Sequence, residues 1–299
     1  MSNKTSMKTG FVPNAYMPPK DIKLESPFEI LKWQLNELAK MGGAVLNGGF
    51  RFPEKQDEKE EIKQILTEKN LEIEFYAAPF MGLAGSDSKE AREAVISSIK
   101  RSKEFGNKIL RSAYNGRLEY KRSRFNKEIP LKEHLRLVIE NLKEMAQIFE
   151  SEGVYLAVEN HCDFTGKDFA EIFSAVNSKH IGSGLDTGNS YTVYADPIDD
   201  AEALAEYTFS THIKDMMMME MRTGLGLIPL QARGCAIGDG NIDIPYIIDL
   251  LDKKSPFASG LRLIIEQGWM YVPEGIDSGQ YNRDCLLKGM KYLNGLLGH

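Results

Sequence analysis

The sequence has few cysteines, no long apolar run and no basic block, and each absence excludes a class of protein. The three cysteines, Cys162, Cys235 and Cys285, are odd in number, far apart and without Cys-x-x-Cys spacing, which argues against a disulfide framework. No apolar run approaches the ~20 residues that a membrane helix needs. The segment Met1 to Lys8 lacks the apolar core of a signal peptide. We therefore expect a cytoplasmic protein without a membrane partner.

Basic charge is also scarce and scattered. The chain has 37 Lys and Arg against 43 Asp and Glu, for a net charge of −6, and a serine interrupts its longest basic cluster at residues 121–124. Nucleic-acid binding needs a basic patch or stripe, so we expect no nucleic-acid partner. No Gly-x-Gly-x-x-Gly motif follows the first apolar segment, which disfavours an open, doubly wound sheet of the dinucleotide-binding kind.

What the sequence does contain is a regular alternation of short apolar segments with longer amphipathic ones. In residues 28–38 the apolar side chains recur at near-helical spacing. The preceding Ser26 and Pro27, with Glu29, form the pattern of a helix-starting capping box. The short segments are compact and apolar, as expected for strands buried on both faces of a parallel sheet. The eight predicted strands are Lys8–Val12, Ala44–Asn47, Leu71–Ala77, Ile109–Ser112, Tyr155–Glu159, Gly182–Asp186, Ser210–Ile213 and Arg262–Glu266.

Eight repeats of a strand followed by a helix predict a parallel sheet, most commonly closed into a barrel. The length of 299 residues suits one such barrel, which typically takes roughly 250 residues or more. We predict an α/β fold with a single (β/α)₈ TIM barrel domain over residues 1–299. Its active site is expected at the C-terminal ends of the strands, where barrel enzymes place their chemistry.

The longest segment predicted to be irregular runs from Asp215 to about Asn241, after the seventh strand. It holds Arg222, Arg233 and several glycines. Loops of this length are usually functional, and we expect this one to arch over the catalytic end of the barrel. The run of methionines at residues 216–219 is interpreted as packing material rather than a cofactor site.

Ligand-type side chains come at the ends of four neighbouring strands: Glu159, Asp186, His212 and Glu266. Any one of them alone is more typical of a helix cap, a surface charge or a buried core histidine. Three carboxylates at one rim would repel one another unless a cation lay among them, so the set predicts one divalent ion. Three oxygen donors and one imidazole favour Mn²⁺, Mg²⁺ or Co²⁺, and they leave Zn²⁺ open.

The residues around these ligands form recognisable motifs. They are Val158-Glu159-Asn160-His161, Leu185-Asp186-Thr187-Gly188-Asn189, His212-Ile213-Lys214-Asp215, Gly238-Asp239-Gly240-Asn241-Ile242-Asp243 and Ile264-Ile265-Glu266. With these motifs the sequence resembles the xylose-isomerase-like TIM barrel family, which contains sugar phosphate isomerases and epimerases.

The resemblance implies that Glu159, Asp186, His212 and Glu266 hold one Mn²⁺-like ion. It also implies that the two glutamates act as acid and base on opposite faces of a sugar. The ketose epimerases of the family have a histidine where this chain has Asn189. They also have an arginine shortly after the metal histidine, for which the candidates here are two loop arginines, Arg222 and Arg233.

We therefore expect a divalent-metal-dependent isomerase or epimerase that acts on a keto sugar or related polyol through an enediolate. The same enediolate would serve a lyase, as in inosose dehydration or the cleavage of 3-keto glycosides and C-glycosides. A non-catalytic sugar-binding barrel is the third alternative.

The base would be Glu159, Glu266 or His161. His161 is a candidate because an imidazole with an ordinary pKa of ~6.5 suits proton transfer near neutrality. The alternative role for His161 is to orient Glu159.

A small carbohydrate is the expected partner. The absence of a glycine-rich phosphate cradle favours a non-phosphorylated substrate. Lys214 is predicted to bind a substrate hydroxyl or oxyanion, and Trp269 to form a flat wall under a sugar ring. The oligomeric state stays open, and a homo-oligomer is one of the options. The predicted substrate-binding residues are Asn189, Lys214, Arg222, Arg233 and Trp269.

Overall fold

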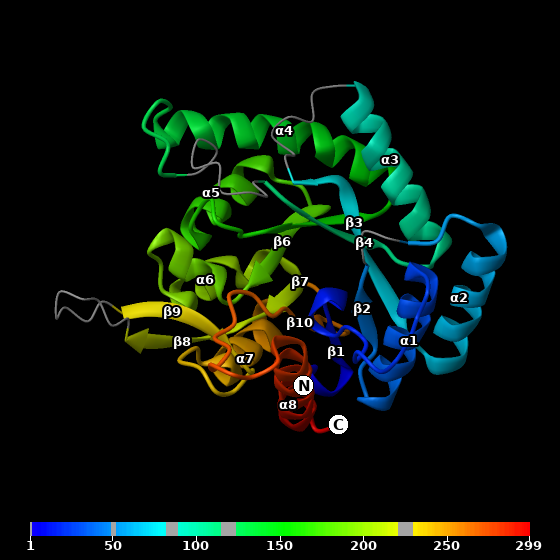
Figure 1. Ribbon diagram of the computed structural model, residues 1–299. Coiled ribbons are helices and arrows are strands. Elements are labelled where there is room, and N and C mark those ends of the chain that lie inside the picture. The colour runs from blue at the N-terminus through cyan, green and yellow to red at the C-terminus, as the bar shows by residue number, and fades with distance from the viewer. Residues whose placement is uncertain (1, 49–51, 82–88, 115–123, 221–229) are drawn as a thin grey trace.

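The computed structural model describes residues 2–48, 52–81, 89–114, 124–220 and 230–299. Eight parallel strands close into a barrel in the order β1-β10-β7-β6-β5-β4-β3-β2 (Figure 1), which confirms the predicted (β/α)₈ fold. The predicted strand bounds agree within one or two residues, except that the third strand continues further. The barrel strands are β1 (Lys8–Phe11), β2 (Val45–Asn47), β3 (Glu72–Met81), β4 (Ile109–Ala113), β5 (Tyr155–Glu159), β6 (Ile181–Asp186), β7 (Thr208–Ile213) and β10 (Arg262–Ile265).

Helices cover the outside of the barrel between these strands (Figure 1). The first begins with the predicted capping box, in which Ser26 Oγ accepts from the backbone N–H of Glu29 over 3.2 Å. Within the described residues, no helix is both long and apolar enough to cross a membrane. The helices are α1 (Pro27–Lys40), α2 (Gln56–Lys69), α3 (Lys89–Glu104), α4 (Leu131–Glu152), α5 (Gly166–Val176), α6 (Pro197–Leu204), α7 (Ile244–Lys254) and α8 (Ser278–Leu297).

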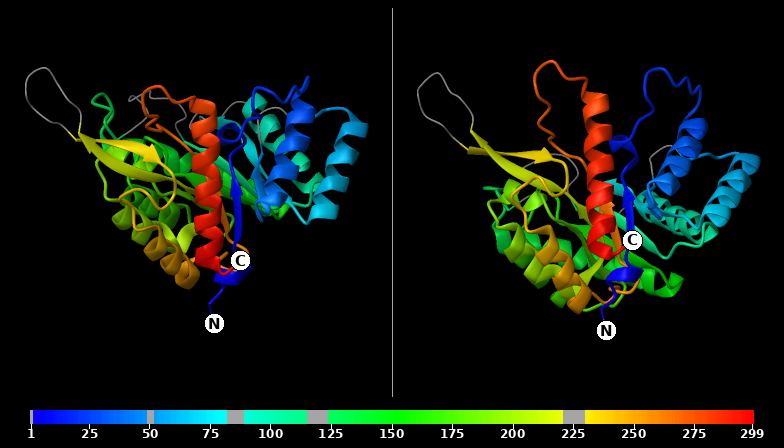
Figure 2. Two further views of the ribbon diagram at one scale, coloured as in Figure 1. Left: turned by 60° about the horizontal axis from the view of Figure 1, so that its bottom comes forward. Right: turned by 90° about the horizontal axis from the view of Figure 1, so that it is seen from below.

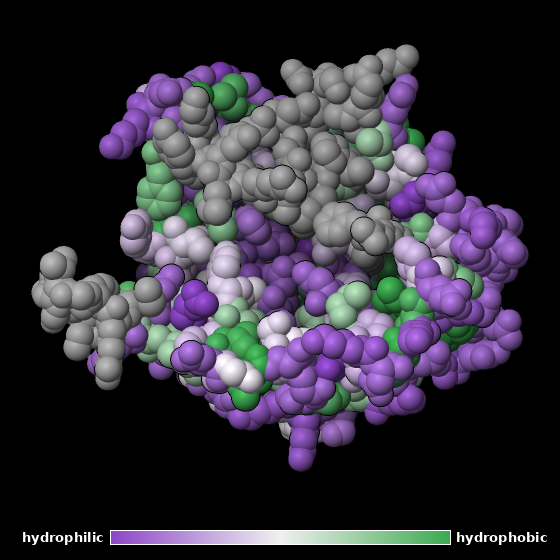
Figure 3. Space-filling model, viewed as in Figure 1, coloured by the Kyte–Doolittle hydropathy of each residue, from purple (hydrophilic) through white to green (hydrophobic). Residues whose placement is uncertain are grey.

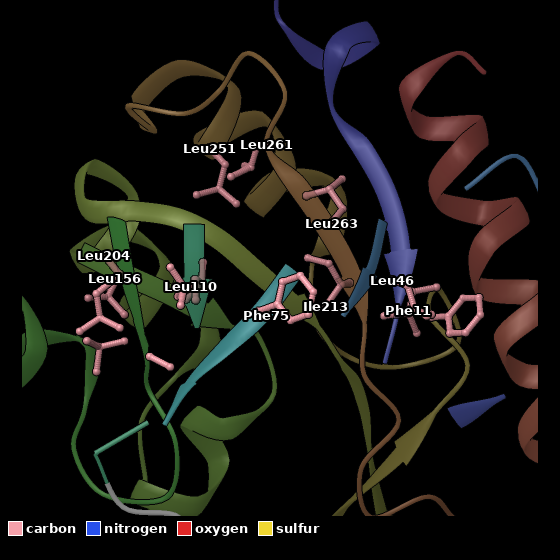
Figure 4. Packing of buried hydrophobic residues seen from close by; sticks show 14 of the residues in the cluster. Phe11, Leu46, Phe75, Leu110, Leu156, Leu204, Ile213, Leu251, Leu261 and Leu263 are labelled. Carbon is pink, nitrogen blue, oxygen red and sulfur yellow. The ribbon is translucent and has the colours of Figure 1, made fainter. Parts of the chain in front are cut away.

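The main hydrophobic core lies between the barrel and its surrounding helices. Apolar side chains from neighbouring strands, among them Leu46, Phe75 and Leu263, pack in one large buried cluster with residues of the helices (Figure 4). Because side chains alternate between the two faces of a strand, the residues next to these in sequence point into the barrel.

The interior of the barrel is charged, whereas we predicted strands that are apolar on both faces. Glu74 lies completely buried between two arginines, with Oε1 3.2 Å from Arg111 Nε and Oε2 3.0 Å from Arg262 Nη1. Ser210 Oγ donates to the same carboxylate over 2.6 Å. A buried charge costs little only when it is paired and hydrogen-bonded, and these residues pair one another across the barrel.

An antiparallel hairpin projects from the barrel after β7, as Figure 2 shows from two further directions. It consists of β8 (Asp215–Glu220) and β9 (Leu230–Cys235), which form a two-stranded sheet of their own. The prediction that residues 215–241 are irregular is therefore wrong for both strands. Side chains in the second half of β8 alternate between half-buried and exposed, as in a ribbon with one face turned to the protein.

Candidate metal centre and its cavity

Four ligand-type side chains meet at the C-terminal ends of neighbouring strands. One ligand atom from each of Glu159, Asp186, His212 and Glu266 lies within 4.8 Å of the others. The first three residues are buried and Glu266 is half-buried. β5 and β6 end at the first two, His212 is the penultimate residue of β7, and Glu266 directly follows β10. The structure thus brings together the four residues that the sequence predicted as one site.

Backbone and amide hydrogen bonds fix the carboxylate of Asp186. Asn160 donates from Nδ2 to the carbonyl oxygen of Asp186 over 3.0 Å and accepts its N–H at Oδ1 over 2.7 Å. Asp186 Oδ1 then accepts from the backbone N–H groups of Gly188 and Asn189, over 2.8 and 3.0 Å. These bonds occupy Oδ1 and leave Oδ2 to face the other ligand-type atoms.

Asn47 sets the orientation of the His212 ring. Asn47 Nδ2 donates to Glu74 Oε1 over 3.2 Å, so its Oδ1 is the atom that faces His212 Nε2, at 3.3 Å. The hydroxyl of Tyr76 donates to the same Oδ1. An amide oxygen can only accept, so Nε2 carries a ring proton. In the neutral ring, Nδ1 is then the nitrogen with a lone pair for a cation.

Two atoms at the centre of this set are buried and have no hydrogen-bond partner among the described residues: Asp186 Oδ2 and His212 Nδ1. His212 Nδ1 lies 3.4 Å from Glu159 Oε2 and 3.4 Å from Glu266 Oε2. Buried polar atoms without partners are rare and call for an explanation. Carboxylate oxygens with one neutral imidazole nitrogen are donors suited to a hard divalent cation, so these residues fit a single such ion.

Lys214 lies beside the ligand set and supplies one positive charge. Its Nζ is 3.1 Å from Asp186 Oδ2 and 3.0 Å from Glu266 Oε2, and it donates to Asn189 Oδ1 over 2.9 Å. The same ammonium lies 4.6 Å from the centroid of the Trp269 ring, within cation–π range. The backbone of Trp269 is left-handed, with φ of 52°, a strained conformation that in folded proteins clusters at functional sites.

The charges of the site act strongly on one another. Burial raises the pKa of Asp186 to about 6, because Lys214 offsets only part of the desolvation and the two glutamates repel its charge. Burial also acts to raise the pKa of Glu266, but Lys214 and His212 outweigh it and hold that pKa well below its usual range. The pKa of Lys214 is raised, since Asp186 and Glu266 outweigh its burial. Lys214 and Arg111, whose Nη1 lies 3.4 Å from Glu159 Oε2, give two positive charges against three carboxylates, which leaves negative charge for a cation to neutralise.

A cavity of about 800 Å³ opens next to the ligand set. It is lined by Glu266 and by four other predicted site residues: His161, Lys214, Arg233 and Trp269. Figure 3 shows a hollow at the centre of this face of the molecule, with hydrophilic residues inside it. Its size is that of a small-molecule site, and its polar wall suits a ligand rich in hydroxyl groups.

His161 is half-buried in the wall of this cavity. Burial lowers its pKa, but a hydrogen bond with Cys162 and the negative charge of Glu159 outweigh burial and raise it to about 10. The imidazole is therefore protonated near neutral pH and can donate a proton. The role of base that we hypothesised for His161 requires the neutral ring.

Asn189 lies inside the ligand set instead of in the cavity wall. Its side chain is completely buried, and Nδ2 donates to Glu159 Oε1 over 3.1 Å while Oδ1 accepts from Lys214. It therefore orients one carboxylate and one ammonium of the site. Arg233 comes from β9, and its Nη2 donates to the carbonyl oxygen of Met270 over 3.4 Å. Arg222, the other predicted arginine, falls outside the described residues.

Three residues that shape the site were not predicted: Asn47, Asn160 and Asp215. The carboxylate of Asp215 accepts from the backbone N–H groups of Gly238, Gly240 and Ile242 over 2.9, 3.0 and 3.3 Å. It thereby ties the start of the hairpin to the loop that follows it. A Cβ atom at Gly240 would lie 2.0 Å from Asp215 Oδ1. The closely spaced glycines of the 238–243 motif were the available signal for such a turn around a side chain.

Comparisons with known proteins agree with this geometry. The family model described as Xylose isomerase-like TIM barrel matches residues 35–286. No curated protein matches the sequence. A barrel protein of that description from Mycobacterium smegmatis, solved in complex with magnesium, is 16% identical with a TM-score of 0.69 over 99% of this chain and 98% of its own.

Two solved enzymes share the fold at similarly low sequence identity. D-psicose 3-epimerase from Clostridium cellulolyticum H10, solved with D-tagatose, is 14% identical, with a TM-score of 0.64 over 97% of this chain and 99% of its own. A 3-keto-D-glucoside 4-epimerase from E. coli is 16% identical, with a TM-score of 0.62 over 97% and 99%. The TM-scores establish a common architecture. At identities this low, the reaction has to be argued from the site itself.

Proposed function

Because the chain belongs to the xylose isomerase-like TIM barrel family, we propose that it is a divalent-metal-dependent isomerase or epimerase of a keto sugar or related polyol. The observation that carries the proposal is the meeting of four ligand-type side chains within 4.8 Å, where His212 Nδ1 is buried without a hydrogen-bond partner among the described residues and Asp186 Oδ2 faces the Lys214 ammonium at 3.1 Å. The epimerases of keto sugars among the structural neighbours support a substrate of this class.

The metal would be held by Glu159, Asp186, His212 and Glu266. We propose Mn²⁺, with Mg²⁺, Co²⁺ and Zn²⁺ as alternatives, and the magnesium in the Mycobacterium smegmatis protein supports a hard divalent ion. When bound, the ion would supply positive charge that stabilises negative charge developing on a substrate oxygen.

Glu159 and Glu266 are the proposed proton-transfer residues. Both have an oxygen 3.4 Å from the same imidazole nitrogen, and Glu266 also lines the cavity. One carboxylate would take the proton from the carbon next to the carbonyl, and the electron pair left behind would give an enediolate. A proton from the other glutamate would then go to the opposite face of that carbon in an epimerase. In an isomerase the proton would be returned to the neighbouring carbon.

Residues of the cavity wall are proposed to bind the sugar. Lys214 lines the cavity and keeps its positive charge, so it would donate to a substrate oxygen in place of one of the carboxylates that it now contacts. Trp269 would pack against an apolar face of the sugar, and Arg233 would donate to outer hydroxyls. We propose that Asn189 positions Glu159 and Lys214 instead of contacting the sugar, because its side chain is completely buried between them.

The position of His161 in the cavity wall favours a second candidate reaction. A lyase that expels a β-substituent from the enediolate must deliver a proton to the leaving group. The imidazole of His161 would deliver that proton from the cavity wall. The reaction would break the carbon–oxygen or carbon–carbon bond to the substituent, and the enediolate electrons would form the new double bond.

Turnover in deuterium oxide tests the proposal. Metal-loaded protein incubated with D-tagatose, L-ribulose or a 3-keto glucoside should return an isomeric product that carries one solvent deuterium. Chelation should abolish exchange and Mn²⁺ should restore it. Glu159→Gln should lower the rate by roughly 10²–10⁴-fold, as for loss of a general base. The matched variant Glu171→Gln, at an exposed position of α5, should leave it unchanged.

The possible products separate the alternatives. Release of a fragment with loss of mass would identify the lyase. Exchange that persists after chelation and in Glu159→Gln would refute the proposed site. Binding of sugars without any exchange would identify a binding protein.

A further inference from the structure

A second cavity, of about 540 Å³, lies beside the first at the same end of the barrel. It is lined by the connection from β1 to α1, the first turns of α1, Phe52 after β2 and Tyr76 within β3. In Figure 3, hydrophobic residues lie next to the central hollow on the side of α1. The apolar part of the wall is formed by Val12, Met17, Leu24, Ile30, Leu31 and Phe52.

Several polar groups of this second wall are used within the protein. Gln34 Nε2 donates to the carbonyl oxygens of Pro13 and Tyr16, over 2.7 and 2.9 Å. Ser26 Oγ accepts from the backbone N–H of Glu29 and so caps α1. A second sugar ring placed here would bury hydroxyl groups against apolar side chains, which is costly without hydrogen bonds. Apart from Asn14 and the exposed Glu25, the wall therefore favours an apolar occupant.

The two cavities adjoin each other, since Asn14 lines both of them. Tyr76 lines the second, while its hydroxyl donates to Asn47, the residue that orients His212. A substituent on a sugar held in the first cavity would therefore have to pass Asn14 to enter the apolar cavity.

We propose that the second cavity binds an apolar substituent, aromatic or branched alkyl, attached to the sugar whose polar part occupies the first. This inference rests on the proposed function and narrows its substrate class to glycosides or similarly substituted keto sugars. A free hexose would leave about 540 Å³ of apolar cavity unfilled. Filling it with a phenyl group is expected to strengthen binding on the order of 10- to 100-fold.

Methyl-labelled protein loaded with Mg²⁺, which is diamagnetic, gives a direct test by nuclear magnetic resonance. Phenol should shift the methyl resonances of Ile30 and Leu31. Phenyl β-D-glucopyranoside should shift these and also that of Met216, which lines the first cavity. It should bind about 10–100-fold more tightly than methyl β-D-glucopyranoside. Ile30→Trp, which fills the cavity, should reduce the ratio of the two affinities to near one.

Ile30→Gln should also reduce the ratio of the two affinities. Its control is Leu137→Gln, on the exposed face of α4. Leu137→Gln should leave it unchanged. The inference is overturned if phenol leaves the Ile30 and Leu31 resonances unmoved, or if the affinity ratio survives both Ile30 variants. These experiments measure binding only. If the proposed reaction is wrong and this inference is right, deuterium exchange is absent while the methyl resonances still shift.

Discussion

His161 lies in the cavity wall two residues after Glu159, so it can act on the substrate or on the carboxylate beside it. The first role uses the acidic proton of its protonated ring. The second uses the ring only as a hydrogen-bonding neighbour of the ligand set. The two roles affect different quantities, because a proton-transfer group contributes to kcat and an orienting group contributes to metal affinity.

The variant His161→Asn separates them. If His161 is the proton donor of the lyase, kcat should fall on the order of 10²–10⁴-fold at saturating Mn²⁺ with metal affinity nearly intact; if the two glutamates transfer both protons, kcat should be retained. Mn²⁺ titration calorimetry and steady-state kinetics provide the two measurements. His299→Asn, at an exposed position, should change neither. If affinity for Mn²⁺ falls by roughly 10–100-fold and excess metal restores activity, His161 orients Glu159 instead.

The four ligand-type residues could be predicted because each ends or closely follows an apolar strand, and all such ends meet at one rim. Asn47 could not. It also ends a strand, but its function depends on His212, which lies 165 positions further along the chain. The sequence around either residue gives no sign that the two side chains meet in the folded protein. The same holds for Asn189, which looked like a substrate contact and instead lies buried between Glu159 and Lys214.

Among the elements, the hairpin of β8 and β9 is the one that we did not predict from the sequence. The methionine run in β8 has no alternation of polar and apolar residues, and strand prediction relies on that alternation. Asp215 holds the base of the hairpin to the loop at residues 238–242, and Gly234 holds β9 to residues 269–271. Gly234 donates its N–H to the carbonyl oxygen of Trp269 over 2.9 Å and accepts from Tyr271 N–H over 2.9 Å.

Gly234→Ala tests that attachment. A Cβ atom there would lie 2.2 Å from the carbonyl oxygen of Gly268, so the hairpin must move away from residues 268–271. We expect a loss of about 1–3 kcal/mol in the free energy of unfolding and weaker sugar binding, with Mn²⁺ affinity retained. Urea unfolding and calorimetry measure these quantities.

Gly295→Ala in α8 is the matched control, since a Cβ there meets nothing within 4 Å. It should stabilise the protein by roughly 0.5–1 kcal/mol. Equal effects of the two variants would show that the close approach at Gly234 is unimportant.

For the molecule as a whole, the buried charges of the barrel interior couple folding to pH. Burial raises the pKa of Glu74, but Arg111 and Arg262 outweigh it and hold the pKa below its usual range. A carboxylate whose pKa is lower in the folded state stabilises the fold above its unfolded pKa of about 4.5. That stabilisation is lost as the pH falls through the folded-state pKa.

Glu74→Gln should therefore cost about 3–5 kcal/mol near pH 7, because it leaves buried arginines without their counter-charge. Below pH ~4.5 the free energy of unfolding should fall less steeply in the variant than in the unmodified protein. Urea unfolding at a series of pH values measures both effects. Glu206→Gln removes an exposed ion pair with Lys254 and should cost less than about 1 kcal/mol. Parallel pH curves for Glu74→Gln and the unmodified protein would contradict this account.

The barrel itself could be predicted because its strands and helices alternate with unbroken regularity, and that regularity is a local property of the chain. Its charged interior could not, although Glu72 and Glu74 alternate with apolar residues in β3. A carboxylate there is compatible with burial only because of arginines from β4 and β10. Those partners are distant in sequence, and pairing among them is a property of the closed barrel alone.

The hairpin is hydrogen-bonded strand to strand only within itself, so the barrel closes without it. A change in its length or composition alters the wall of the sugar cavity and leaves the register of the eight barrel strands untouched. Such a separable part is a natural subject for engineering. Libraries confined to β9 can vary which sugars are accepted, while the residues that hold the ion and move protons stay in place on a scaffold that does not have to be redesigned.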